Sequence, residues 1–185
     1  MVRVVPPTTI SGWVNNSFVW LAVKATDLIA VMLLFCFNLA FSAITTKPIL
    51  TLEVANEMAK ECLKLAKDSN WKINIAIFES PGALKFYASM DGTYPASEEI
   101  SRLKGKTSAG LPFTTKELAQ MAFNGENKNE GLATIPSIAL LPGGAPIILN
   151  DGTHIGGVGV SGSSGANDEK CAKEAIKKGL SIIYG

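Results

Sequence analysis

Histidine is scarce in this sequence: its 185 residues include one, His154. A Ser-His-Asp triad would have this residue as its only imidazole base, and no Gly-x-Ser-x-Gly segment presents a serine nucleophile. A catalytic zinc site needs three protein ligands, more than one histidine and scattered carboxylates readily supply. The composition therefore argues against a hydrolase triad and against a zinc enzyme.

An excess of charge is also lacking, because 17 Lys and Arg residues face 16 Asp and Glu residues. No basic patch indicates a nucleic-acid partner, and no run of like charge indicates an acidic tail. The chain has no internal repeat and no low-complexity tract. These absences leave a globular domain whose partner is not selected by charge.

Cysteine is sparse as well, with three residues and no Cys-x-x-Cys spacing, which excludes the common metal and thiol-redox motifs. Cys36 lies inside an apolar run, whereas Cys62 and Cys171 each lie in a segment that we expect to be helical. This pair is interpreted either as two small buried residues or as a disulfide formed in an oxidising compartment. The sequence leaves both interpretations open.

One long apolar run is present, Leu28–Phe37, and it continues less strictly to Ala43. Lys24 precedes the run, and Ala40-Phe41-Ser42 supplies small residues before a cleavage point after Ser42. A charged region, a short apolar run and a small-residue exit are typical of a secretory signal peptide. The run is also short for a transmembrane helix, which needs about 20 residues.

Two other interpretations of this segment remain. The region before the run is unusually long and holds a second apolar patch, Phe18–Val23, so an uncleaved signal anchor is possible. The third interpretation is that translation starts further downstream, so that the first residues of the sequence were added by a misplaced start codon. We therefore expect residues 1–46 to be a signal peptide or signal anchor with an extended n-region, and residues 47–185 to form one domain. That domain is expected to be periplasmic or extracellular after cleavage, and membrane-anchored without it.

Periodicity and turn residues predict the elements of this domain. Helices are expected at 51–68, with Thr51 as N-cap, at 95–110, capped by Ser97, at 115–123 and at 167–184. Strands are expected at 73–78, 83–90, 132–140, 145–149 and 154–160. Hairpins dominate this order, so we predict an α+β fold with a five-stranded antiparallel sheet. Helices should flank both faces of the sheet, with the first and last helices on the same face.

The last predicted strand is rich in glycine, with Gly156, Gly157 and Gly159 leading into the Ser161–Gly165 segment. It lacks the Gly-Lys-Ser/Thr ending of a phosphate-binding loop, which argues against nucleotide binding. The bare positions are better explained as places where a helix or a neighbouring subunit sits on the backbone. Strict alternation along this strand would place His154 on the same face as Gly156, Val158 and Val160.

Several groups of residues carry a resemblance to a known family. They are Met90-Asp91-Gly92; Ser97 through Glu99-Ile100-Ser101 to Lys104–Ala109; Pro142–Ile147; and Asp151-Gly152 with Ile155–Gly162, followed by Asp168-Glu169 and Ala172. In this order they resemble the GlcG/HbpS family of haem-binding domains, often labelled haem-degrading and akin to the C-terminal domain of PduO. The resemblance covers essentially all of residues 49–184. It implies a profilin-like domain that assembles into homo-oligomers and binds haem, with a corrinoid as the less favoured ligand.

The same resemblance suggests site residues. The family's Lys-Ala-x-Thr-Ala reads here Lys104-Gly105-Lys106-Thr107-Ser108, so Lys104 and Thr107 are candidate pocket residues. Met90 and His154 are added because a thioether and an imidazole can ligate haem iron. Tyr87 and Met121 are further groups of this kind, and each also has an ordinary structural explanation. No catalytic residue and no separate metal site is assigned.

The function expected from the whole sequence is that of a secreted or periplasmic oligomeric domain that binds haem or a related tetrapyrrole. One alternative is a haem-degrading or other oxidative enzyme, in which the bound iron does the chemistry. Another is an accessory small-molecule-binding protein of a glycolate- or diol-utilisation cluster that binds no haem. A membrane would be a partner only through an uncleaved N-terminal segment.

Overall fold

The computed structural model describes residues 48–185, and the predicted signal segment lies outside the described residues. The elements are α2 (Leu52–Asp68), β1 (Asn74–Glu79), β2 (Ala83–Ser89), α3 (Ala96–Gly110), α4 (Thr115–Phe123), the 3-10 helix η1 (Glu130–Thr134), β3 (Gly144–Ile148), β4 (His154–Ser161) and α5 (Gly165–Tyr184). Within residues 48–185, no helix combines the length and the apolar character that crossing a membrane requires.

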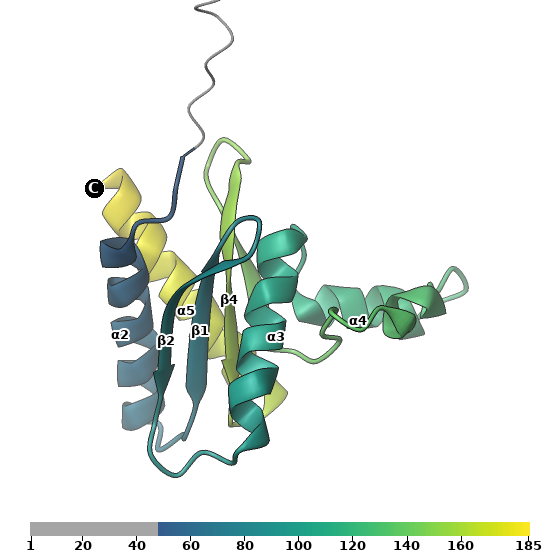
Figure 1. Cartoon of the computed structure of the whole chain (residues 1–185), viewed down its shortest axis with the longest axis horizontal. Helices are drawn as coiled ribbons and strands as arrows, with labels where there is room; N and C mark the ends of the chain where they lie inside the picture. The colour runs from purple at the N-terminus through teal and green to yellow at the C-terminus, as the bar shows by residue number, and fades with distance from the viewer. Residues whose placement is uncertain (1–47) are drawn as a thin grey trace, which may run out of the picture. The chain divides into compact units, whose positions relative to one another are not determined.

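The strands form one antiparallel sheet in the order β2-β1-β4-β3. Helices α2 and α5 cover one face of this sheet, and α3 covers the other (Figure 1). The α+β class, the antiparallel pairing, and the first and last helices on a shared face are thereby confirmed. Thr51 caps α2 as predicted, because its hydroxyl accepts a hydrogen bond from the Val54 N–H.

Two predicted details are wrong. Within the described residues the sheet has four strands, not five, because residues 132–140 form the end of η1 and irregular turns. Pro136 lies in that segment and lacks the N–H that a strand would donate. Ser97 does not cap α3 either: the cap position belongs to Pro95, and the buried Ser97 hydroxyl accepts a 2.6 Å hydrogen bond from the Asn74 side-chain amide.

The face under α2 and α5 holds the main hydrophobic core. Alternate residues of β1 and β4 point into it, among them Ile75, Ile77, Val158 and Val160, all fully buried. A disulfide between Cys62 and Cys171 joins the two helices across this core, with 4.9 Å between the Cα atoms. The structure thus favours the disulfide interpretation of the two cysteines over two free buried thiols.

The face under α3 is built differently, through close approach of main chains. At Gly105 of α3, an added Cβ would lie 2.9 Å from the Ala76 carbonyl oxygen and 3.0 Å from the Gly159 nitrogen. At Gly159 of β4, an added Cβ would collide with the backbone of Ser101 and Gly105. The glycines therefore serve as a packing device, as the sequence indicated.

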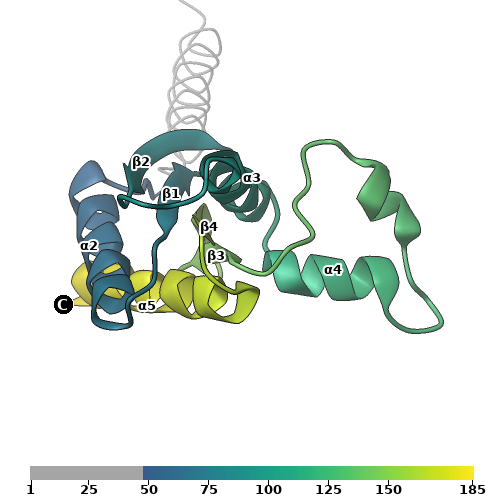
Figure 2. The same cartoon turned by 90° about the horizontal axis from the view of Figure 1, so that it is seen from below.

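The chain between α3 and β3 leaves the body of the domain. Helix α4 and η1 form an arm that extends to one side of the sheet and its covering helices (Figure 2). The start of the arm is held because the Thr115 hydroxyl accepts from the Gly144 N–H at 2.9 Å and donates to the Leu141 carbonyl at 2.6 Å. Helix α4 and η1 therefore lie outside the helices that cover the two faces of the sheet.

Candidate functional site

The arm forms an open cavity of about 580 Å³. Its walls combine apolar side chains with a polar rim, contributed by Leu111, Phe113, Leu118, Met121, Asn124, Gly125, Glu126, Asn127, Asn129 and Leu132. Ligand cavities are typically about 300–1,000 Å³ and mainly apolar, with few polar groups. The size and lining of this cavity therefore suit a largely apolar molecule with polar substituents.

Local sequence signals fix the helix that forms one wall. Thr114 and Glu117 make a capping box: the Thr114 hydroxyl accepts from the Glu117 N–H at 3.1 Å, and the Glu117 carboxylate accepts from the Thr114 N–H at 2.7 Å. After α4 ends, the Asn129 N–H donates to the Met121 carbonyl at 2.8 Å. This bond folds residues 124–129 back over α4 and so forms the second side of the cavity, which stays open to solvent.

Met121 is the cavity residue with a soft donor atom. Its side chain lies on α4, lines the cavity and stays 42% exposed, so the thioether is accessible. A methionine sulfur can serve as an axial ligand of haem iron. The sequence singled out Met121 only as one of several groups of this kind, because nothing in the sequence showed that the 124–132 segment folds back over its helix.

Thr107 is buried and fully engaged, close to where the chain returns from the arm. Its hydroxyl lies 2.8 Å from the Leu103 carbonyl and 3.3 Å from the Ser137 carbonyl, and it accepts from the Ala139 N–H at 2.9 Å. In this structure Thr107 therefore holds the returning segment against α3. It does not line the arm cavity.

Lys104 is buried, with a 3% exposed side chain, and forms an ion pair with the equally buried Asp168. Its ammonium donates to Asp168 Oδ2 at 3.1 Å and to the Val160 carbonyl at 2.9 Å, which links α3, β4 and α5. Burial lowers the pKa of Lys104, and the Asp168 charge opposes that effect. Burial also raises the pKa of Asp168 against the pull of Lys104. The ammonium would have to leave this pair to contact a ligand.

His154 occupies the opposite face from the one that strict alternation predicts. The register between β3 and β4 shifts at this point, since Ile148 pairs with His154 while the adjacent Ile147 pairs with Gly156, which leaves Ile155 as an extra residue. Because of this bulge, His154 points to the opposite face of the sheet from the one that the two-residue period would give it. The ring Nε2 lies 2.8 Å from each of the carbonyl oxygens of Ser108 and Gly156, so this nitrogen donates to them.

Met90 lies apart from these residues. It follows β2, is partly buried and packs against the core on the α2 and α5 face. Lys104, Thr107 and His154 all lie on or beside α3, on the other face of the sheet. The structure thus brings three of the four sequence-predicted residues to one helix and does not bring Met90 to them.

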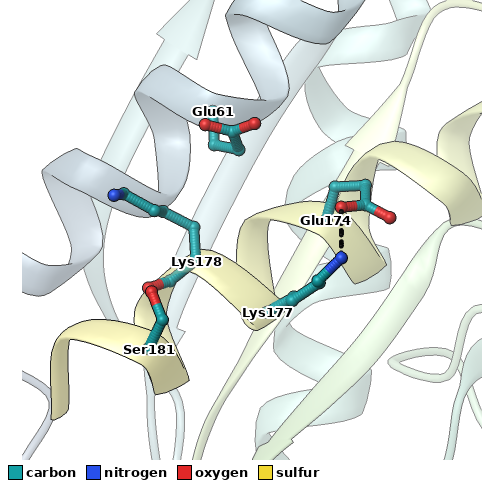
Figure 3. Close-up of a pocket in the computed structure, with 5 residues that line it drawn as sticks. All are labelled: Glu61, Glu174, Lys177, Lys178 and Ser181. Atoms are coloured by element: carbon teal, nitrogen blue, oxygen red, sulfur yellow. Dashed lines mark hydrogen bonds and ion pairs between the residues drawn. The ribbon is translucent and has the colours of Figure 1, made fainter. Parts of the chain in front are cut away.

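A second cavity, of about 210 Å³, lies between α2 and α5 (Figure 3). Glu61, Glu174, Lys177, Lys178 and Ser181 line it, and Lys177 forms an exposed ion pair with Glu174 at 3.7 Å. Its mixed charge and small volume do not suit a tetrapyrrole. Across residues 48–185, no group of three or more His, Cys, Asp or Glu side chains is placed to hold a metal ion.

Both the sequence and the fold of this chain are similar to those of known proteins. Residues 50–177 match the family described as haem degrading protein HbpS-like. Protein GlcG of Escherichia coli (strain K12) is 35% identical over 116 residues, which are 63% of this chain and 84% of GlcG. The crystal structure of HbpS superposes with a TM-score of 0.67 at 28% identity, covering 74% of this chain and 94% of HbpS.

The crystal structure of a complex of PduOC with haem shares the fold. It has a TM-score of 0.64 and covers 71% of this chain and 95% of the other. The identity in that comparison is 20%, so this likeness concerns the fold alone. The family match over residues 50–177 and the likeness to GlcG and HbpS agree with the resemblance in the sequence, and the chain belongs to the HbpS-like family of haem degrading proteins, which is the GlcG/HbpS family.

Proposed function

We propose that this protein binds haem or a related tetrapyrrole, and that the arm cavity receives it. The observation that carries the proposal is the 580 Å³ cavity itself, in which leucine and phenylalanine walls surround the Met121 thioether. Such walls favour the apolar macrocycle through the hydrophobic effect. Asn124, Asn127 and Asn129 at the rim supply amides that can donate hydrogen bonds to the propionates.

The donor set implies loose binding. Among the described residues that line the cavity, Met121 has the one soft donor atom, and no imidazole lies with it. In this proposal Thr107 and Lys104 act indirectly: Thr107 holds the segment that returns from the cavity, and Lys104 anchors α3 to β4 and α5. His154 remains a second candidate ligand through Nδ1. The family's haem degrading description adds support, and the haem complex of PduOC shows that a protein of this fold can hold haem.

A haemin titration followed at the Soret band tests the proposal, with three chains compared. With the wild-type chain, the Soret band should shift, and the shift should saturate at micromolar haemin. Met121→Leu keeps the apolar volume but removes the sulfur, so its Soret position should change and its affinity should fall several-fold. His154→Gln retains a side-chain donor toward the Ser108 carbonyl and should titrate like wild type. No saturation in wild type would sink the proposal, and a loss confined to His154→Gln would move the ligand to His154.

The enzymatic alternative is separated by adding reductant and oxygen to the complex. An intact Soret band identifies a binding protein, whereas its stoichiometric loss with the appearance of a bile pigment identifies haem breakdown. An accessory protein without haem would fail the first titration and still fold. The family description keeps the enzyme as the main alternative.

The same proposal includes export. The signal-like sequence before residue 43 directs the chain across a membrane, and the Cys62–Cys171 disulfide is of the kind that persists in oxidising compartments. Exposed apolar residues on the arm outside the cavity, Phe123 and Ile135 among them, support self-association into a homo-oligomer. Light scattering on the purified chain measures that state, and a strictly monomeric mass would contradict it.

A further inference from the structure

One end of the domain exposes a group of large apolar side chains that the haem proposal does not use. Ile49 is 67% exposed, Leu52 60%, Tyr184 50%, Ile182 39% and Ile183 38%. These five residues are called the apolar end. A soluble surface carries single apolar residues routinely, whereas a gathered set marks a contact with a partner or a membrane.

The two helices bring these residues together because they run antiparallel. Cys62 of α2 is bonded to Cys171 of α5, and Met58, one turn earlier in α2, contacts Gly179, two turns later in α5. Continuing the same progression, the last turn of α5 reaches the first turn of α2. Figure 1 shows the start of α2 and the C-terminus at the same end of the domain.

This end is fixed rather than frayed. The Tyr184 hydroxyl accepts a 2.7 Å hydrogen bond from the Asn150 N–H, which ties the last helical residue to the β3–β4 turn. A tyrosine that is apolar along its ring and polar at its tip is the type of side chain that favours a membrane–water interface.

The position of the apolar end in the chain indicates its occupant. Ile49 is the second residue of the described domain, and the run Leu28–Phe37 lies a short distance upstream in the sequence. Residues 38–48 separate the two, and eleven residues reach at most roughly 36–40 Å when fully extended. The chain therefore enters the domain at the apolar end, a short stretch of sequence after the apolar run.

We propose that the chain keeps its N-terminal apolar run as an anchor and that the apolar end rests on the lipid bilayer. The contact is apolar, with Ile49, Leu52, Ile182 and Ile183 inserted at the level of the headgroups and Tyr184 at the interface. Because the five residues are uncharged, the contact should persist at high salt. The inference is independent of haem binding, which concerns the arm.

The experiment uses the full chain in phosphatidylcholine vesicles that carry a nitroxide at carbon 5 of the acyl chains. Cys36→Ser removes the third cysteine of the sequence, and an environment-sensitive fluorophore is attached through Ile183→Cys. The matched position is Leu141→Cys: Leu141 is 56% exposed, and its neighbour Pro142 packs on Gly165 at the opposite end of α5. Cys62 and Cys171 stay unlabelled because they are paired and buried.

Quenching by the nitroxide should be at least three-fold stronger at position 183 than at position 141, and unchanged in 1 M salt. Adding Leu52→Glu should reduce it at position 183, while α2 is retained because glutamate is favoured in a first helical turn. Equal weak quenching at both positions overturns the inference. So does recovery from cells of a chain cleaved after Ser42, or a spectral shift at position 183 that needs a second copy and no lipid. A haemin titration on the same vesicles reports separately on the proposed function.

Discussion

On one face of the sheet, α2 and α5 pack through interlocking side chains, whereas on the other face α3 packs through bare main chain. The first face holds Met58, Ile75, Ile77 and Val158 around a disulfide. On the second face, Gly105 and Gly159 bring the helix and strand backbones into direct contact. Both faces are buried, but the first holds many more apolar side chains that can shift to absorb a change than the second, whose cluster is Ala76, Phe78 and Ala109.

The difference extends to polar groups. The α3 face ends in the buried Lys104–Asp168 pair, while the α2 and α5 face is apolar and covalently joined. Side chains can move between rotamers to relieve a small error in packing, but a backbone in contact with a backbone cannot. Substitutions on the α3 face should therefore cause larger losses per added or removed atom than substitutions on the other face.

The sharpest test of this comparison is at two neighbouring residues of β4. Gly159→Ala adds one methyl where the backbone of Ser101 and Gly105 already lies, so the free energy of unfolding should fall by more than about 4 kcal/mol. Val160→Ala removes two carbons from the opposite face and should cost about 2 kcal/mol. Urea denaturation followed by circular dichroism measures both. A Gly159→Ala chain as stable as Val160→Ala would show that α3 can move off the sheet.

On the other face, the disulfide should be the largest single contribution. It joins positions 109 residues apart, and the chain-entropy model gives about 4–5 kcal/mol for a loop of that length. Reductant should lower the thermal midpoint of the wild type by many degrees. The Cys62→Ala, Cys171→Ala double variant should have that lower thermal midpoint without reductant, and adding reductant should not change it. A wild-type midpoint insensitive to reductant under unfolding conditions would contradict the bond.

The sequence predicted those elements whose signals are local. The Thr51 cap, the hairpin formed by β1 and β2, and the hairpin around Asn150–Gly152 depend on residues a few positions apart. The apolar stripe on α2 and the glycines of β4 indicated the partners that cover them. These signals are local in the chain, so they can be read without knowing the tertiary fold.

The features that the sequence mispredicted or missed depend on long-range contacts. Residues 132–140 have strand-like composition, yet their backbone is held by Thr107 of α3 instead of a neighbouring strand. The face of His154 was mispredicted because a single extra residue, Ile155, breaks the two-residue period. The arm cavity was not predicted because it exists only after residues 124–132 fold back over α4, and that fold is closed by a main-chain bond with no sequence signature.

The buried pair tests whether the α3 face tolerates any loss of a polar partner. Lys104→Met or Asp168→Leu alone leaves one charge buried and unpaired, and each should lower the free energy of unfolding by about 3–5 kcal/mol. The double variant removes both charges and should recover most of that loss. It will not recover all of it, because Asp168 also accepts from the Ser163 N–H at 3.1 Å. Single-variant losses that add in the double variant would refute the coupling.

The smallest expected effect concerns two adjacent carboxylates of α5, Asp168 and Glu169. Their contributions to the free energy of unfolding should change with pH in opposite directions. Burial acts to raise the pKa of Glu169, but the hydrogen bond from Lys173 and the charge of Lys116 outweigh it, and the pKa is lowered. Burial raises the pKa of Asp168 despite Lys104. At Glu169 the unfolded chain therefore binds the proton more tightly, and at Asp168 the folded chain does.

The two groups should consequently act in opposite directions as acid is added. The contribution of Glu169 is present above its ordinary pKa, about 4.3, and is lost as the pH falls through its lower folded value. Asp168 instead favours the folded state as the pH falls from its raised folded pKa toward its ordinary value of about 3.9.

Glu169→Gln should reduce the loss of stability in acid by about 0.5–1 kcal/mol, since both of its lysine partners are half-exposed. Urea denaturation at half-unit pH steps from 3 to 7 measures this, with Glu174→Gln as the control, because Glu174 is an ion-paired glutamate on α5 whose side chain is 41% exposed. If Glu169→Gln and Glu174→Gln gave the same curve, the Lys116 and Lys173 contacts would contribute no more than an ordinary surface pair.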